Sequence, residues 1–234
     1  MDQEIMDLEQ LAAYLQRDAR EVSKLASRGH LPGQKVGGEW RFASAEINYW
    51  ISTQMHAYTE AELSNLEAGA GKKDRLDRQP LVSTLLTEAT IGLDIAASTK
   101  ASVLKSLVTL AEQSWQVYDP AALLEAVKQR EEMSSTAMEN GIAIPHPRRP
   151  NPNILGDSVV AFARTPTGIP FGGRTLSDLF FLVCCKDHTT HLAVLARLSR
   201  LLLRAEFVEE LRGAASAAEV MQRIEMAERE LLGA

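Results

Sequence analysis

The sequence predicts an α/β protein: a C-terminal α/β sandwich around one mixed sheet, preceded by a small N-terminal winged helix-turn-helix domain. Apolar runs at residues 158–163 and 179–184 suit buried strands, and they alternate with segments of helical periodicity. Near the N-terminus, two short helical patterns precede a Gly-Gly hairpin signal. We therefore expect one domain at residues 1–55, a second at residues 80–234, and a connection over residues 56–79, in which residues 59–62 could cap a short helix through Leu66.

Length and composition allow a folded core. The chain has 234 residues, of which 45% are hydrophobic, and a net charge of −6, which argues against nucleic-acid binding over the whole surface. No apolar run approaches the roughly 20 residues that span a bilayer. Residues 1–4 lack the pattern of a secretory signal. The only cysteines, Cys184 and Cys185, are adjacent, so on a strand they point to opposite faces and a disulfide is not expected. We expect a reduced, cytoplasmic protein.

The first 55 residues carry capping and turn signals for three helices and a hairpin. Asp7 and Asp18 are placed to cap two short helices, and Gly29 suits the left-handed position that ends the second. Residues 34–42 predict a hairpin that turns at its Gly-Gly pair. A third helix is expected from residue 45 to residue 53, and it would close the unit.

Helix, turn, helix and a β wing together form a geometry that reads DNA. The candidate DNA-binding residues are Arg20, Lys24 and Arg28 on the second helix, and Lys35 and Arg41 on the wing. Between residues 2 and 49, however, six basic residues face eight acidic ones. Because DNA affinity comes largely from phosphate neutralisation, a tight monomeric binder is not expected. Residues 28–42 resemble the excisionase and MerR-like winged helix-turn-helix family. On its geometry, DNA binding is favoured over a module that only docks proteins.

The second domain shows alternating strand and helix signals. Residues 91–95 predict a strand in addition to the two apolar runs. Thr99 is placed to cap a helix that runs to about Gln113, and Asp119 followed by Pro120 begins a helix that ends near Arg130. Three more helices are expected at residues 190–203, 206–212 and 216–232, the first of them capped by Thr189 or Thr190.

A short stretch from Glu139 to Pro150 carries the strongest chemical signal. An apolar strand end is stopped by Pro145, so His146 falls where the strand opens into a loop. Prolines on both sides stiffen the backbone, and two arginines follow, Arg148 and Arg149. A rigid histidine beside fixed positive charge suits a side chain that accepts an anion. On this stretch alone, a surface histidine in a proline-rich loop is an equal alternative.

The wider pattern resembles enzyme IIA of the fructose/mannitol type in the bacterial phosphoenolpyruvate-dependent sugar phosphotransferase system, including its nitrogen-regulatory relatives. Residues 130–136, 140–146 and 191–202 carry this resemblance, which covers most of the chain from about residue 80. It implies that His146 accepts a phosphoryl group from a small phosphocarrier protein. It also implies that Arg130 lies near the phosphate and that His191 lies beside His146.

The residues themselves leave some of these roles open. Arg130 could bind two phosphate oxygens, or it could stabilise the C-terminus of its helix. Ser135 and Thr136 offer hydroxyl donors but could equally cap the next turn. His191 falls in the first turn of a helix, where a phosphoryl group would be stabilised, although a lone histidine there is more often a surface residue.

A metal site is the alternative for the region around the two cysteines. The spacing of Cys184, Cys185, His188 and His191 brings soft ligands together. Cys184, however, continues an apolar strand, and adjacent strand residues cannot readily face one ion. We therefore expect neither a metal nor another cofactor.

Three functions follow from these observations. The first is a cytoplasmic regulator that binds DNA through its N-terminal domain, with homodimerisation a possibility, and reports phosphorylation at His146. The second is a plain IIA phosphocarrier that passes phosphate to a IIB-type transporter subunit, with an N-terminal module that docks proteins only. The third is a pure binding protein whose acceptor site has lost its activity.

Overall fold

The structure is a computed structural model, and it describes residues 5–71 and 81–233. A four-stranded mixed sheet forms the centre of the C-terminal part, in the order β4-β6-β7-β5. Its strands are β4 (Ile91–Gly92), β5 (Ile142–Ala143), β6 (Val159–Ile169) and β7 (Ser177–Cys184). The long central strands β6 and β7 are antiparallel, whereas β4 is parallel to β6 and β5 is parallel to β7. The predicted mixed sheet is therefore confirmed.

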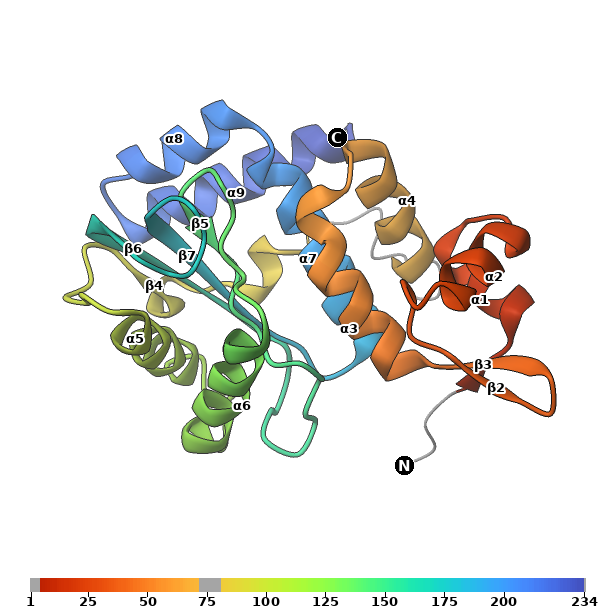
Figure 1. The fold of residues 1–234 in the computed structure, drawn as a ribbon. Helices are drawn as coiled ribbons and strands as arrows, with labels where there is room; N and C mark the ends of the chain where they lie inside the picture. The colour runs from red at the N-terminus through yellow and green to blue at the C-terminus, as the bar shows by residue number, and fades with distance from the viewer. Residues whose placement is uncertain (1–4, 72–80, 234) are drawn as a thin grey trace.

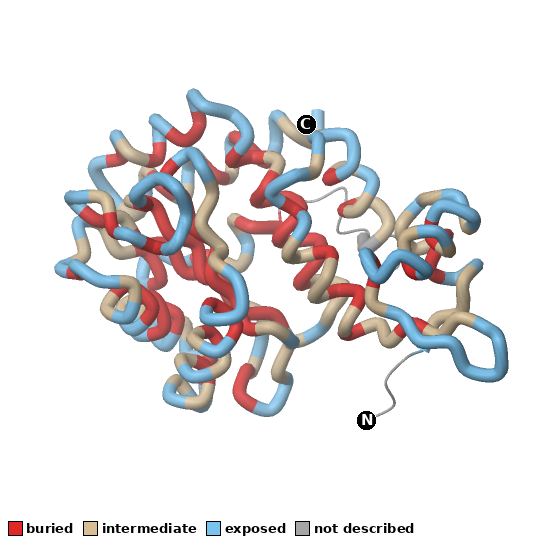
Figure 2. The backbone as a smooth tube through the Cα atoms, viewed as in Figure 1, coloured by how far each residue is buried: buried red, intermediate tan, exposed pale blue. Residues whose placement is uncertain are grey.

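Helices cover both faces of this sheet (Figure 1). One layer holds α5 (Lys100–Glu112) and α6 (Pro120–Met133), and the other holds α7 (His188–Leu202), α8 (Ala205–Gly213) and α9 (Ala217–Leu232). Two short 3-10 helices, Ser83–Leu85 and Glu88–Thr90, precede β4. The two cores appear as the buried segments in Figure 2.

Side chains of β7 alternate between these two cores, as a strand buried on both faces requires. Phe180 and Cys184 pack into the core under α5 and α6, whereas Phe181 and Cys185 pack into the core under α7. The two cysteines are fully buried free thiols on opposite faces of the sheet. That placement agrees with the sequence-based expectation that they form no disulfide and cannot together face one ion.

The N-terminal unit is a winged helix-turn-helix. It comprises β1 (Ile5–Met6), α1 (Leu8–Leu15), α2 (Ala19–Ser27), β2 (Gln34–Val36), β3 (Glu39–Ala43), α3 (Ser44–Gln54) and the 3-10 turn η1 (Met55–Ala57). Asp7 and Asp18 cap α1 and α2 as predicted, and Gly29 has the expected positive φ of 72°. Strand β1 was not predicted; it pairs antiparallel with β3 and completes a three-stranded sheet.

Within the expected connection, the predicted short helix through Leu66 is present, but it is longer and packed: α4 (Glu60–Gly71). Leu63 and Glu67 are only 1% and 2% exposed, and the Glu67 carboxylate forms salt bridges with Arg197 and Arg200 of α7. Arg197 also pairs with Glu228 of α9. The arginine partners of Glu67 lie 130 or more residues away along the chain, so local periodicity could not show them. The rest of the expected connection, residues 72–79, lies outside the described residues.

The N-terminal unit shares a continuous apolar core with the second domain. Ile47, Ile51 and Met55 belong to the same cluster of buried side chains as Leu192 and Leu195 of α7. Figure 1 shows α3 lying along α7, between the sheet and the outer helices α1 and α2. In the part of the chain that the structure covers, no helix has the length and apolar character to cross a membrane.

Candidate active site

His146 lies where the backbone leaves strand β5. The chain stays paired with β7 just beyond the strand, because the Val183 N–H donates to the Pro145 carbonyl at 3.0 Å. The His146 ring is 4% exposed, and its Nδ1 lies 2.8 Å from the Ile144 carbonyl oxygen. A carbonyl can only accept, so Nδ1 carries the proton and Nε2 carries the lone pair. Among the described residues Nε2 has no hydrogen-bond partner, so it is available as a nucleophile.

The charge state of the ring supports this role. Burial lowers the pKa of His146 well below its ordinary value, and the positive Arg130 and nearby His191 lower it further. The hydrogen bond to Ile144 acts in the opposite direction and does not reverse the shift. At neutral pH the imidazole is therefore uncharged, which is the form that can attack phosphorus.

His191 lies beside His146. The two ring centroids are 5.3 Å apart and the rings meet edge to face, with an interplanar angle of 62°. His191 is 3% exposed and is therefore not the surface residue that a lone first-turn histidine often is. Burial, with smaller contributions from His188 and Arg130, lowers its pKa to about 3, so this ring is neutral as well. Its Nδ1 has no partner among the described residues.

The cap of the helix that carries His191 differs from the prediction. Asp187, and not Thr189 or Thr190, is the N-cap: its Oδ1 accepts from the Thr190 N–H at 2.8 Å. The Thr190 hydroxyl donates to the other carboxylate oxygen at 2.8 Å, so this threonine supports the cap instead of forming it. Helix α7 consequently begins two residues earlier than expected, and the His191 N–H is already bonded to the Asp187 carbonyl.

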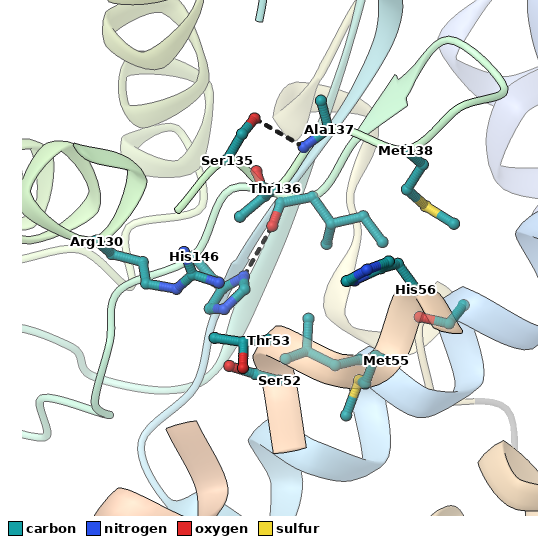
Figure 3. A pocket seen from close by; sticks show the side chains of 13 residues that line it. Ser52, Thr53, Met55, His56, Arg130, Ser135, Thr136, Ala137, Met138 and His146 are labelled. Carbon is teal, nitrogen blue, oxygen red and sulfur yellow. Dashed lines mark hydrogen bonds between the residues drawn. The ribbon is translucent and has the colours of Figure 1, made fainter. Parts of the chain in front are cut away.

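The Arg130 side chain extends into the same site from the last turn of α6. It is 2% exposed, and its Nη1 donates to the Ser134 carbonyl at 2.7 Å. Its Nε lacks a hydrogen-bond partner within the described ranges. Figure 3 shows the guanidinium directed towards the His146 ring in a pocket that both residues line. Arg130 therefore bonds the backbone that follows its helix and also faces the histidine, and its binding of phosphate oxygens stays a prediction.

Ser135 and Thr136 line this pocket too, but their hydroxyls are engaged elsewhere. The Thr136 hydroxyl donates to a Glu131 oxygen at 2.7 Å, and its N–H donates to the other oxygen at 3.0 Å. The Ser135 hydroxyl donates to the Phe171 carbonyl at 3.0 Å and accepts from the Ala137 N–H at 3.2 Å. These contacts fix the loop between α6 and β5 in its position beside His146.

Glu131 is a residue whose role sequence reasoning missed. Its carboxylate is 1% exposed, binds Thr136 and pairs with Lys100 at 3.2 Å, so it holds the loop that follows Arg130. A signal was present: Leu123 and Val127 form the buried stripe of α6, and the next positions on that stripe are Arg130 and Glu131. Two charged residues that continue an apolar stripe indicate a site.

Helix α3 supplies the residues that no local pattern could indicate. The Tyr49 ring lies 4.5 Å from the Arg148 guanidinium carbon and 5.3 Å from that of Arg130. The Glu46 carboxylate binds Arg148 at 2.7 Å and Arg149 at 2.5 Å. Further residues of α3 and η1 form one wall of the pocket that contains His146: Ser52, Thr53, Met55 and His56 (Figure 3).

Helix α2, which with its C-cap carries three of the predicted DNA-binding residues, lies on the outer side of the N-terminal unit (Figure 1), whereas Arg41 lines the same surface groove as Glu46. Arg20, Lys24 and Arg28 are exposed on or just after α2, and Lys35 is exposed on β2. Lys35 lies over the Trp40 ring at 5.1 Å. Arg41 is only half-exposed and pairs with Glu39 at 2.7 Å, so the wing offers one free cation fewer than its sequence suggests.

The fold and this site define a class of protein: a IIA-type phosphotransfer domain joined to a helix-turn-helix domain. Residues 84–227 match the family model of the phosphoenolpyruvate-dependent sugar phosphotransferase system, EIIA 2, and residues 5–55 match that of a helix-turn-helix domain. The chain therefore belongs to the EIIA 2 family. The fused architecture expected from the sequence is confirmed.

Individual relatives agree with this assignment. The chain is 33% identical to the fructose-specific EIIABC component of Bacillus subtilis over 134 residues, which are 56% of this chain and 21% of that protein. It therefore spans about a fifth of the length of this relative. It is 32% identical to the fructose-specific EIIA component of Haloferax volcanii over 56% of this chain and 85% of that protein. The crystal structure of nitrogen regulatory protein IIA-Ntr from Neisseria meningitidis superposes with a TM-score of 0.56 and 26% identity, covering 62% of this chain and 99% of that one.

Proposed function

We propose that this chain is a cytoplasmic regulator of a phosphotransferase system. His146 accepts a phosphoryl group from a phosphocarrier protein, and the N-terminal unit binds DNA. The observation that carries the first half is the buried, uncharged His146 ring, whose Nδ1 is held by a carbonyl while Nε2 is free beside Arg130. The match of residues 5–55 to a helix-turn-helix domain supports the second half.

In the proposed transfer, the lone pair of His146 Nε2 attacks the phosphorus of the donor's phosphohistidine. The new N–P bond forms as the donor's N–P bond breaks, and the donor imidazole leaves with that electron pair. Phosphoryl transfer asks a protein mainly for positioning and charge stabilisation. The Ile144 carbonyl keeps the ring in the correct tautomer, and the Arg130 guanidinium stabilises charge on the phosphoryl oxygens. The unpartnered Nδ1 of His191 is a candidate for a further hydrogen-bond donor.

The proposed DNA contact uses the exposed cations of α2 and β2. Arg20, Lys24, Arg28 and Lys35 supply it, while the Glu39–Arg41 pair weakens the wing. The N-terminal unit still carries more acidic than basic residues, so one copy should bind DNA weakly. Two copies on two half-sites would bind more tightly, because the second contact becomes intramolecular.

A second candidate function is that of a plain phosphocarrier that passes phosphate to a IIB-type subunit. The similarity to the fructose-specific EIIABC component of Bacillus subtilis favours it. In that case the N-terminal unit docks proteins only, which suits its excess of acidic residues. Retention of specific duplexes by the full chain at low salt separates the two candidates, since a pure phosphocarrier retains none.

Incubation with a purified, phosphorylated carrier tests the acceptor directly. The chain should gain one acid-labile, base-stable phosphoryl group that maps to His146, and His146→Ala should remain unlabelled. Glu125→Ala, an exposed change on α6, serves as the control and should label normally. Labelling that persists in His146→Ala would overturn the assignment.

A further inference from the structure

The acceptor site is covered by the N-terminal unit of its own chain. Residues of α3 and η1 line the pocket that holds His146, and the space left between them is about 50 Å³. A buried water needs roughly 10–15 Å³ by the same measure, so this space admits a few waters at most. Transfer requires reacting atoms about 3–3.5 Å apart. The phosphohistidine of another protein cannot approach Nε2 so closely while α3 stays in place.

The contacts that hold α3 over the site use the cations of the site itself. The Glu46 carboxylate occupies Arg148 and Arg149, as an anionic group would. The Tyr49 ring lies against the guanidinium groups of both Arg130 and Arg148, so it covers part of the arginine surface of the site. We propose that the Glu46–Tyr49 face of α3 is an intramolecular ligand of the acceptor site, which competes with the phosphocarrier for this arginine surface. The inference rests on the proposed role of His146 as the acceptor.

The ion pairs that join α3 and α4 to the C-terminal domain differ in strength. Helix α4 is anchored by the Glu67 carboxylate, which is 2% exposed and pairs with Arg197 and Arg200. The ion pairs of α3 are weaker, because Glu46 is 34% exposed and its two arginine partners are 36% and 46% exposed. In the proposal, the unit opens about residues 57–59, between η1 and α4, while α4 stays bound. This opening separates Ile47, Ile51 and Met55 from the apolar core that they share with α7. Opening also separates α1 from α4, which are joined by the Gln16 to Asn65 hydrogen bond.

Phosphorylation would shift this equilibrium. A phosphoryl group adds about 1.5 to 2 negative charges. Placed on His146, that charge attracts the arginines that α3 now occupies and repels the Glu46 carboxylate. If phosphorylation weakens docking of α3, docking must disfavour phosphorylation by the same factor. The exposed cations of α2 remain uncovered in the closed arrangement, so any effect of this contact on DNA binding does not come from masking of α2.

The test compares full-length variants in phosphotransfer from the phosphorylated carrier. Glu46→Gln and Glu46→Lys should raise kcat/KM roughly three- to tenfold, because the apparent affinity for the carrier rises with the open fraction. The matched control is Glu60→Gln on α4, an exposed carboxylate that should leave the rate unchanged.

A second measurement reports opening without any transfer. Fluorescent labels at Ser27→Cys and Glu209→Cys occupy exposed positions on the two domains, and the native cysteines are buried. The distance between the labels should increase in Glu46→Lys and in the phosphorylated wild type. Equal transfer rates together with an unchanged distance in Glu46→Lys would overturn the inference. If no variant accepts phosphate, the proposed function fails, and the distance in unphosphorylated Glu46→Lys still decides whether Glu46 holds α3 closed.

Discussion

The two sets of cations in this chain lie in opposite environments. Arg130 is buried beside His146, and Arg148 is packed against Tyr49. Arg20, Lys24 and Arg28, by contrast, extend into solvent from the region of α2. A buried guanidinium with fixed partners can stabilise charge at one defined atom, whereas exposed cations suit a diffuse partner such as a row of phosphates. Substitution of a buried arginine is therefore expected to change function much more than substitution of an exposed one.

The largest effect is expected at Arg130. Arg130→Ala should slow labelling of His146 by roughly 10²-fold or more, as loss of one preorganised donor does in other enzymes. Arg130→Lys, which retains the charge but not the planar fork, should recover only part of the rate. Single-turnover labelling with excess phosphorylated carrier measures this, and circular dichroism confirms that the variants fold. An unchanged rate would leave Arg130 with only its bond to the Ser134 carbonyl.

Charge reversal on α2 should have a smaller effect, and one that depends on salt. Lys24→Glu combined with Arg28→Glu should weaken binding to a selected duplex by roughly 10- to 100-fold at low salt and reduce the dependence on salt concentration. Lys105→Glu combined with Lys128→Glu on the C-terminal domain changes the net charge equally and serves as the control. If both double variants bind the duplex equally weakly, then DNA binding depends on the net charge of the protein alone and not on the cations of α2.

Sequence reasoning succeeded where local signals determine the structure. The caps at Asp7, Asp18, Thr99 and Asp119 and the apolar runs of β6 and β7 defined most elements, and hence the fold class. The position of His146 after a strand followed from one proline. All of these signals lie within a few residues of the element that they define.

What the sequence could not show depends on contacts between distant residues. Glu46 meets Arg148 across 102 positions, and α4 is stabilised by Arg197 across 130. The prediction placed the cap of α7 on Thr189 or Thr190. The neighbouring Asp187 is the cap instead, because its carboxylate accepts hydrogen bonds more strongly than a hydroxyl does. Glu131 occupies a position on the buried stripe of α6, which was a sequence signal, but a charged residue at such a position could equally have been exposed to solvent.

The two buried histidines predict a loss of stability in acid. Their folded pKa values lie below the ordinary value of 6.5, and that of His191 is about 3. Below pH 6.5 the unfolded chain therefore binds protons that the folded chain does not. The free energy of unfolding should fall by about 1.4 kcal/mol per pH unit for each histidine, until its folded pKa is reached.

Urea unfolding at pH 7.5, 6.0 and 5.0 measures this slope. His191→Asn should make the slope shallower by the contribution of one histidine, whereas replacing the exposed His30 by Asn should leave it as it is. A slope that is equal in the wild type and in His191→Asn would mean that folding does not lower the pKa of His191.

The central claim is that the state of the buried site changes what the exposed cations do. The measurement is a titration of one duplex, selected from a random library, with the unmodified and the phosphorylated full-length protein at matched salt. Coupling between two sites typically amounts to ~1–3 kcal/mol. We therefore expect the dissociation constants of the two forms to differ several-fold. Equal constants, with phosphorylation of His146 verified by mass spectrometry, would contradict the account and leave two domains that only share a chain.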